Sequence, residues 1–309
     1  MLSQSSSIGC TIIGGGVIGT SLADGLLGAS VANSKTKPAS TNTIYHVRLT
    51  TRRGDHAAEL RKRYPDFFVT KNNRDSALWG PHAWPLSSVP AVHVVLICTQ
   101  PQYTQDVCDD LRAAAKLVTT KIPTVFVTVC PGISVATLES WLPQGAGIVR
   151  TMPNTPVCVA EGATAAFANG AAKSRPETVA AVTEMFHLMS PAVCFVPEEG
   201  LMDVAASVSG SAPAYVFTLL ESMVEAGVRR GLPRDLAVAL VTQSGFGSAL
   251  LALKGDNSLR GLVENVCVPG GSTERAMDAL RRRDFAGAVD DGVEVSLRAN
   301  RAMGHVDGN

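Results

Sequence analysis

Apolar positions follow two different spacings in the first two thirds of the chain. Short runs of strand length alternate with longer amphipathic segments in which apolar residues recur at helical spacing. These runs predict strands at 9–13, 44–49, 67–69, 92–98, 124–129, 147–150, 163–167 and 193–196, and helices at 17–27, 55–64, 104–116, 135–142 and 177–189. The run 92–98 is interpreted as a fully apolar strand, buried on both faces. Such alternation is typical of an α/β fold, here a Rossmann-type, doubly wound and mainly parallel sheet.

The pattern changes after residue 199, where only helical spacing remains. Helices are predicted at 201–207, 214–229, 235–254, 259–265, 273–283 and 285–301. We therefore expect an α/β domain at 1–199 and an all-helical domain at 200–309. The helix 235–254 is apolar around much of its circumference, so it is expected to be buried on all sides. A second subunit would bury it most readily, and a central position in a monomeric bundle is the alternative.

Composition limits the class of protein. The 309 residues are 46% hydrophobic, and 27 basic residues balance 27 acidic ones, which argues against a disordered chain and against binding to nucleic acid or membranes by charge. No apolar run approaches the roughly 20 residues of a membrane span, and the N-terminus lacks a secretory pattern. Seven scattered cysteines without a C-x-x-C pair indicate neither a metal site nor disulfides, so we expect a cytoplasmic protein with reduced thiols.

The polar stretch 33–42 and the proline-containing stretch 81–90 are expected to be surface loops.

A glycine motif lies between the first strand and the first helix. Gly14, Gly16 and Gly19 match G-x-G-x-x-G, with Val17 and Ile18 at the start of the helix. The three glycines would permit a tight turn, close approach of a pyrophosphate, and close packing of helix on strand. The helix N-terminus would then stabilise the anion. This context predicts nucleotide binding, and a purely structural turn is the alternative.

The end of the second strand indicates which nucleotide binds. The sequence there is Thr50, Thr51, Arg52 and Arg53, without the acidic residue that binds the ribose of NAD. Hydroxyls and arginines suit a 2′-phosphate, which favours NADPH, with NADH as the second choice. The arginines could instead be ordinary solvated charges.

Other candidate positions follow later strands. The segments Cys98–Pro101 and Val129–Gly132 come directly after apolar strands, where a doubly wound sheet binds ligands. The segment 150–156 is expected to be a rigid polar loop because it holds two prolines, and Asn154 and Thr155 in it suit a nicotinamide or a substrate. Small residues at 209–215 favour close backbone approach at a helix start. Ordinary turns are the alternative for each segment.

A second glycine turn precedes the helix predicted at 273–283. Backbone N–H groups of Gly270 and Gly271 at a helix N-terminus would form a nest for a carboxylate. Thr273 could offer its hydroxyl to a substrate nitrogen. The alternative is that Ser272 or Thr273 simply caps the helix.

These motifs, in this order, resemble the pyrroline-5-carboxylate reductase family over nearly the whole chain. The strongest matches are Met152–Pro156, Glu161–Thr164, Ser209–Tyr215, Gly231–Pro233 and Pro269–Thr273. The resemblance implies reduction of Δ1-pyrroline-5-carboxylate to L-proline by NAD(P)H, in proline biosynthesis. It also implies a homodimer formed through the helical domain, a larger ring of dimers in some members, and an active site at the dimer interface.

The resemblance also assigns residues. It gives the cofactor to Gly14, Gly16, Val17, Ile18, Gly19, Thr50, Thr51, Arg52, Arg53, Asn73, Cys98, Thr99, Gln100 and Pro101, with Asn154 near the nicotinamide. It gives the substrate carboxylate to Val268, Pro269, Gly270, Gly271, Ser272 and Thr273. Thr273 would lie near the imine nitrogen as the catalytic residue. Hydride transfer to a protonated imine needs no strong general acid, and the six histidines lie in no motif.

Three positions depart from the family pattern. Members usually carry Lys in place of Gln100, Ser or Thr in place of Val268, and Thr in place of Ala206. Two hydroxyls are thus absent from the expected substrate end, and such losses change substrate discrimination. A reductase of another small anionic cyclic imine, such as a six-membered ring or an intermediate of specialised metabolism, is the first alternative. A nucleotide-binding regulator without catalysis is the second, and the intact Thr273 and Gly-Gly turn argue against it.

Overall fold

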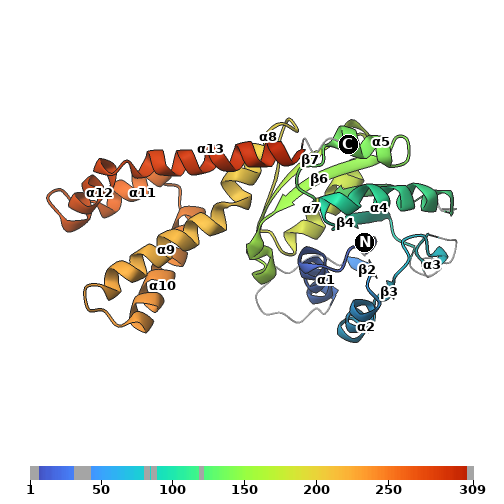
Figure 1. Cartoon of the computed structure of the whole chain (residues 1–309), viewed down its shortest axis with the longest axis horizontal. Helices are drawn as coiled ribbons and strands as arrows, with labels where there is room; N and C mark the ends of the chain where they lie inside the picture. The colour runs from blue at the N-terminus through green and yellow to red at the C-terminus, as the bar shows by residue number, and fades with distance from the viewer. Residues whose placement is uncertain (1–6, 31–42, 80–83, 85–88, 118–121, 305–309) are drawn as a thin grey trace, which may run out of the picture. The chain divides into compact units, whose positions relative to one another are not determined.

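The computed structural model describes residues 7–30, 43–79, 84, 89–117 and 122–304. The chain forms two compact units, one up to Gly210 that also takes in the chain from Arg298 onward, and one from Ser211 to Leu297 (Figure 1). Each unit is described by itself below. The stretch 33–42 and most of 81–90, both predicted to be surface loops, lie outside the described residues.

The first unit is built on one sheet. Its strands are β1 (Ser7–Ile13), β2 (Ile44–Thr50), β3 (Phe68–Thr70), β4 (Val92–Ile97), β5 (Thr124–Thr128), β6 (Gly147–Pro153), β7 (Ala163–Ala168) and β8 (Ala192–Phe195). Within the described residues the order is β3-β2-β1-β4-β5-β6-β7-β8, and all neighbouring pairs are parallel except β6 with β7. This arrangement confirms the predicted doubly wound, mainly parallel sheet. It also brings the carboxyl ends of β1, β2, β4, β5 and β6 to one edge.

Helices cover both faces of this sheet. On one face, α1 (Val17–Ser30), α2 (Gly54–Arg63) and α7 (Pro176–His187) pack on a core that contains Val94 and Leu96. On the other, α3 (Ser76–Trp79), α4 (Pro101–Ala114) and α5 (Val135–Trp141) pack on a core that contains Val95 and Ile97. Successive side chains of a strand point to opposite faces, so every residue of β4 is buried.

One buried residue of β4 is polar, so the interpretation of this strand as fully apolar is wrong. The Nε2 atom of His93 lies 2.8 Å from Oγ1 of Thr11 on β1. Burial lowers the pKa of His93 to about 3, so the ring is neutral. A hydrogen-bonded neutral histidine is tolerated in a core, which is why the strand persists.

The segment after β6 differs from the predicted loop. The strand extends to Pro153 and pairs antiparallel with β7, and a 3₁₀-helix, η2 (Thr155–Val159), follows. Proline suits both places, because Pro153 is the last strand residue and Pro156 lies at the start of η2, so neither proline removes a needed hydrogen bond.

Short helices complete the first unit. The helix predicted at 104–116 includes most of the 3₁₀-helix η1 (Ala115–Leu117), whereas the sequence indicated no helix for α6 (Gly170–Lys173). The helix α8 (Leu201–Ala205) passes directly into a π-helical turn, η3 (Ala206–Gly210). Wide turns of this type often occur at functional sites.

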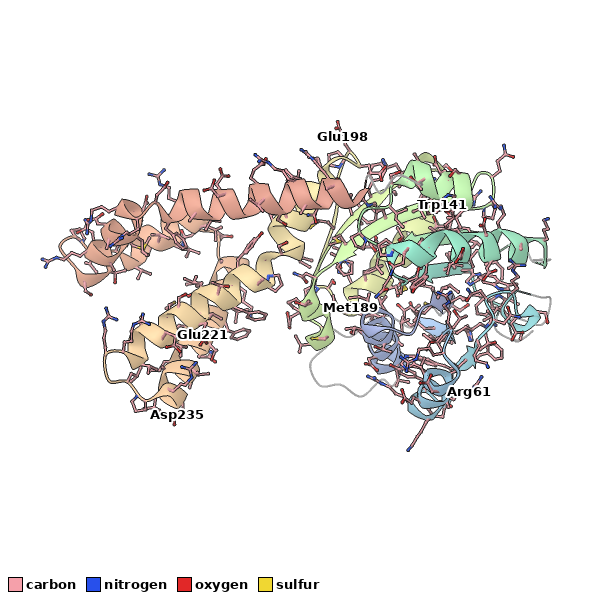
Figure 2. The ribbon with its side chains drawn as sticks, viewed as in Figure 1. Arg61, Trp141, Met189, Glu198, Glu221 and Asp235 are labelled. Atoms are coloured by element: carbon pink, nitrogen blue, oxygen red, sulfur yellow. The ribbon has the colours of Figure 1, made fainter. Side chains whose placement is uncertain are left out.

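The second unit is helical throughout its described length. It holds α9 (Ala212–Val228), α10 (Arg234–Lys254), α11 (Leu259–Val266), α12 (Ser272–Arg282) and the first part of α13 (Phe285–Gly304). Arg234 at the start of α10 forms ion pairs with Glu221 and Glu225 of α9, and its Nη2 atom lies 2.7 Å from Oε1 of Glu221. Figure 2 labels Glu221 on α9 and Asp235, the residue that follows Arg234.

The chain alone does not bury α10. Ala237 is its one buried residue, whereas Leu240, Phe246 and Leu251 each expose about 60% of their surface. A central helix of a monomeric bundle would be buried, so that alternative is wrong. The exposed apolar face of α10 needs a contact with another protein surface.

By length and composition, α10 is also the one helix of the described chain that could cross a membrane, with a mean hydropathy of 1.7. The expectation that no segment reaches this length is therefore wrong. Thr242, Gln243 and Ser244 interrupt the apolar run, but no charged residue lies between Asp235 and Lys254. A single such helix is weak evidence for a membrane span, because core helices of proteins without a membrane span can have the same length and composition.

Candidate active site

The glycine loop joins β1 to α1 in the first unit. Gly14 has a φ of +109°, and a side chain there would lie 2.7 Å from the carbonyl oxygen of Cys98. A side chain at Gly19 would overlap the carbonyl oxygen of Gly14. Gly16 is exposed and has nothing within 4 Å of the position a side chain would take, so a ligand can approach its backbone. The geometry is that of a nucleotide-binding turn.

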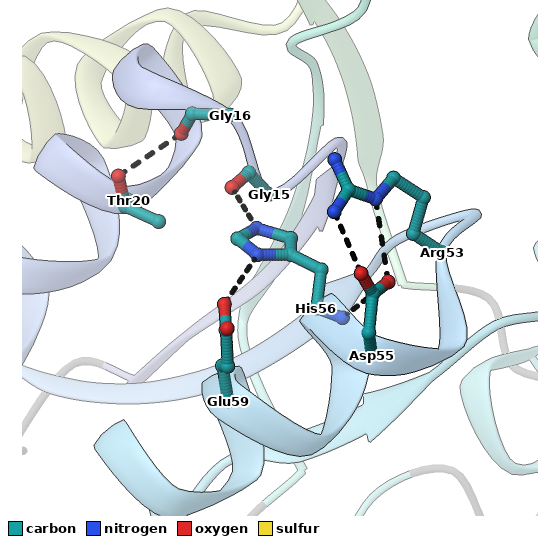
Figure 3. A network of polar contacts seen from close by, with 7 residues as sticks. All are labelled: Gly15, Gly16, Thr20, Arg53, Asp55, His56 and Glu59. Carbon is teal, nitrogen blue, oxygen red and sulfur yellow. Dashed lines mark hydrogen bonds and ion pairs between the residues drawn. The ribbon is translucent and has the colours of Figure 1, made fainter.

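The loop is held from the neighbouring helix α2. The Nε2 atom of His56 lies 2.7 Å from the carbonyl oxygen of Gly15, and its Nδ1 atom lies 3.2 Å from Oε2 of Glu59 (Figure 3). These two hydrogen bonds raise the pKa of His56 above its ordinary value. The sequence indicated no role for this histidine, because Gly15 lies 41 positions away along the chain and no motif connects them.

The end of β2 carries hydroxyl and guanidinium groups, as predicted. Thr50 donates to Oδ1 of Asn73 at 2.8 Å, and Nδ2 of Asn73 donates to Asp110 at 3.1 Å. Asn73 therefore lies beside the expected cofactor position, but both ends of its amide are occupied by protein.

The two arginines have different surroundings. Arg53 is paired with Asp55 at 2.6 Å, and this hydrogen bond lowers the pKa of Asp55 to about 2. The guanidinium of Arg52 lies over the ring of Tyr103, 4.4 Å from its centroid. No carboxylate of the described chain lies within ion-pair distance of Arg52, so its charge is the more available for a phosphate.

The ends of β4 and β5 contact each other. The Cys130 thiol donates to the carbonyl oxygen of Thr99 at 2.8 Å, and the Thr99 and Thr104 hydroxyls lie 3.1 Å apart. Burial raises the pKa of the Cys98 thiol, so it stays neutral. Gln100 occupies the N-cap position of α4 without a side-chain capping hydrogen bond, and Pro101 is the first helical residue, so the predicted helix at 104–116 begins three residues earlier.

Asn154 connects three segments at the end of β6. Its Oδ1 accepts from the amide of Ala163 at 2.8 Å, and its Nδ2 donates to the carbonyl oxygen of Ser209 in η3 at 3.3 Å. The Met152 side chain approaches Gly210 of the same turn. The side chain of Asn154, which was predicted to lie near a nicotinamide or a substrate, therefore joins the end of β6 to the π-helical turn.

A small pocket opens between the ends of β5 and β6 and the η3 turn. It is lined by Cys130, Pro131, Gly132, Arg150, Thr151, Met152, Met202, Asp203, Ala206 and Asn300. The buried Arg150 lies 3.2 Å from Glu199 and 3.0 Å from Asp203, and Glu199 also accepts from the amide of Val135 at 2.7 Å. The sequence did not indicate these ion pairs, because their partners are far apart along the chain.

The predicted substrate turn lies in the second unit. Gly270 has a φ of +73°, and Gly271 is the N-cap of α12, without help from a side chain. The alternative that Ser272 or Thr273 caps the helix is therefore wrong. The amide of Gly271 donates to Val268 at 2.8 Å, and the amide of Gly270 donates to Oε2 of Glu274 at 2.7 Å. Both backbone amides expected to bind a substrate carboxylate thus already have acceptors. For the amide of Gly270, that acceptor is the carboxylate of Glu274.

The structure brings the predicted cofactor residues together at one edge of the first unit. Val268–Thr273 belong to the other unit, so their joining to the cofactor residues stays a prediction. In the described part of the chain, no group of three or more His, Cys, Asp or Glu side chains could hold a metal ion.

Comparison with protein families finds a match in the last third of the chain. Residues 199–303 match the family model described as pyrroline-5-carboxylate reductase dimerisation. This range covers α8 to nearly the end of α13, including the exposed α10. The description implies a homodimer, and the exposed apolar face of α10 lies within the matched range.

Whole-chain comparisons agree. The chain is 48% identical over 295 residues to a Delta-1-pyrroline-5-carboxylate reductase of Gibberella fujikuroi, covering 96% of both proteins. It resembles the structure of a pyrroline-5-carboxylate reductase from Coxiella burnetii, with a TM-score of 0.78, 27% identity, and coverage of 97% and 98%. The fold is also that of a Plasmodium falciparum pyrroline carboxylate reductase with NADP bound, with a TM-score of 0.73, 23% identity, and coverage of 96% and 98%.

Proposed function

Because the chain belongs to the pyrroline-5-carboxylate reductase family, we propose that it reduces Δ1-pyrroline-5-carboxylate to L-proline with NADPH as the hydride donor. The observation that carries this proposal is the likeness to a Delta-1-pyrroline-5-carboxylate reductase over 96% of both chains. That likeness spans both the glycine loop and the Val268–Thr273 turn. The available charge of Arg52, which follows the end of β2, supports NADPH, with NADH as a second donor.

The reaction adds a hydride to the imine carbon and a proton to the nitrogen. NADPH supplies the hydride when it is bound. The N-terminus of α1 stabilises the pyrophosphate, and Asn154, held at both ends of its amide, fixes the wall beside the nicotinamide. The first turn of α12 binds the substrate carboxylate, and the Thr273 hydroxyl donates to or accepts from the ring nitrogen.

We propose that formation of a homodimer completes the active site. We infer that residues 1–199 bind the cofactor and that residues 200–309 form the dimer and bind the substrate. The exposed apolar face of α10 supports a homodimer, and dimers could associate further into a ring. Seven unpaired cysteines support a cytoplasmic location.

The direct test is oxidation of NADPH by the purified protein, followed with and without Δ1-pyrroline-5-carboxylate. Formation of L-proline in equal amount to the NADPH consumed is the expected result. Binding of NADPH without reduction of any cyclic imine would favour the non-catalytic regulator instead.

A second candidate substrate is a different cyclic imine, such as a six-membered imino acid. Ala206 lines the pocket where relatives usually carry a hydroxyl, and Val268 exposes 68% of its surface beside the glycine turn. Both changes replace a hydrogen-bonding position with an apolar one, which suits a ring with an additional methylene. A comparison of kcat/KM for five- and six-membered imino acids decides between the two.

Glu274 gives a prediction about substrate affinity. Its carboxylate accepts from Gly270 at the turn assigned to the substrate carboxylate, so the two anions compete for one region. Glu274→Gln is expected to lower the KM of the carboxylate substrate about three- to tenfold with little change in kcat. Steady-state kinetics check this, with Glu264→Gln on α11 as the matched surface control. An unchanged or higher KM would mean that Glu274 only stabilises the start of α12.

The two arginines give a prediction about the cofactor. The double variant Arg52→Ala with Arg53→Ala is expected to weaken NADPH binding about tenfold or more and NADH binding about twofold or less, because only NADPH carries the 2′-phosphate. Fluorescence titration with both nucleotides measures the ratio. An unchanged ratio would make the arginines surface charges, and Arg229→Ala with Arg230→Ala in the second unit is the control.

A further inference from the structure

His56 contacts the glycine loop from outside the motif. It lies in the first turn of α2, which begins directly after the arginines at the end of β2. Its ring bridges Gly15 of the loop and Glu59 of its own helix, with distances of 2.7 Å and 3.2 Å (Figure 3). A side chain at Gly15 would collide with Leu60 of α2, so loop and helix pack closely here.

The two partners of His56 favour the charged form of the ring. The Gly15 carbonyl can only accept a hydrogen bond, and so can the Glu59 carboxylate. The imidazolium has an N–H group for each, whereas the neutral ring has only one. Loss of the proton therefore costs one of the two contacts and leaves the ring less firmly oriented.

The charge of His56 lies beside the expected phosphate positions. Gly15 precedes Gly16, whose backbone is open to a ligand. On the side of α2, the charged groups acting on the ring are Glu59 and Arg53. Arg53 pairs with Asp55, which also accepts from the backbone amide of His56. From the loop, Gly14 to Val17 contribute no titratable side chain. His56 is therefore the group near the loop whose charge changes around neutral pH.

We propose that His56 is a proton-dependent positioning residue for the dinucleotide, whose imidazolium form holds the glycine loop and favours the bound pyrophosphate. This inference rests on the proposed function, since it requires a bound dinucleotide. Cofactor binding takes up a proton whenever His56 is partly deprotonated in the free protein.

The expected pH dependence follows from the direction of the shift. The pKa of His56 is raised above its ordinary value of 6.5, so the ring is charged at lower pH and loses its proton as the pH rises through the raised value. The Kd of NADH should therefore be lowest near about pH 6 and should rise about five- to tenfold by about pH 8.5. NADH is the better probe, because it lacks the 2′-phosphate, and such a phosphate itself titrates near about pH 6.

The test uses the full chain and three measurements. NADH affinity is titrated across this pH range for the wild type, His56→Gln and the control His187→Gln. Proton uptake is measured by calorimetry in two buffers of different ionisation enthalpy. Glutamine can still donate to Gly15 but carries no charge, so it separates the charge from the hydrogen bond. His187, an exposed histidine at the end of α7, lies outside the glycine loop and its network.

We expect a nearly flat Kd and no proton uptake for His56→Gln, with wild-type behaviour for His187→Gln. Wild-type pH dependence and proton uptake in His56→Gln would overturn the inference, and so would a flat wild-type profile. Failure of the wild type to bind either NADH or NADPH at every pH would contradict the proposed function itself. Thermal unfolding of each variant identifies a loss that comes from misfolding.

Discussion

Replacing Gly19 by alanine should weaken NADPH binding by about a hundredfold or more, because small displacements of a positioned loop have effects of that size. The new methyl group would overlap the carbonyl oxygen of Gly14, which is rigid backbone. Gly14 cannot move away freely, since its own amide donates to Thr50 at 3.0 Å. We therefore expect the β1–α1 turn to open, and the anion site at the start of α1 to be lost. Titration of NADPH fluorescence measures the loss.

Gly170→Ala is the matched control for this variant. Gly170 also begins a helix of the first unit, but nothing lies within 4 Å of the position of the added methyl group. NADPH binding by this control should be unchanged. Normal NADPH binding by Gly19→Ala would show that the loop can relax, and that its close packing has no role in nucleotide affinity.

Removal of the Thr273 hydroxyl should have the second large effect. Thr273 lies in the first turn of α12, beside the glycine turn assigned to the substrate. If its hydroxyl contacts the ring nitrogen, Thr273→Ala should lower kcat about a hundredfold, a typical effect of removing a group that assists proton transfer. The Kd of NADPH should change by no more than about twofold, because the residues proposed to bind the cofactor lie in the other unit.

Thr273→Ser should restore most of the turnover, since it keeps the hydroxyl and loses only a methyl group. Steady-state kinetics and NADPH titration on all three proteins are sufficient. Equal losses of turnover and NADPH affinity in Thr273→Ala would reject a role on the substrate side.

Much of the first unit was predictable from residue patterns. Strands buried on both faces are mostly apolar, so β1, β4 and β5 were visible as short runs even though β1 holds the buried Thr11 and β4 the buried His93. The glycine motif was recognisable because turn, strand and helix follow each other locally. The end of β6 was not predictable in this way, because two prolines are as common in loops as at strand ends.

Long-range contacts explain the other differences. The bridge from His56 to Gly15, the pairing of Arg150 with Glu199 and Asp203, and the contact of Asn154 with Ser209 each join separate elements. No local spacing encodes such pairs. The contact between Glu274 and Gly270 is local, but an acidic residue in the first turn of a helix is so common that it did not stand out.

The path of the chain between the units has a consequence for synthesis. The chain leaves the first unit after Gly210 and returns at Arg298, and Asn300 then donates to the carbonyl oxygen of Asp203 at 3.4 Å and to the Ser207 hydroxyl at 3.3 Å. A nascent chain emerges from the ribosome in order, so these contacts form only after the whole second unit has emerged. The π-helical turn beside Asn154 is therefore completed late, and the first unit reaches its final form only after the residues of the second unit have been synthesised.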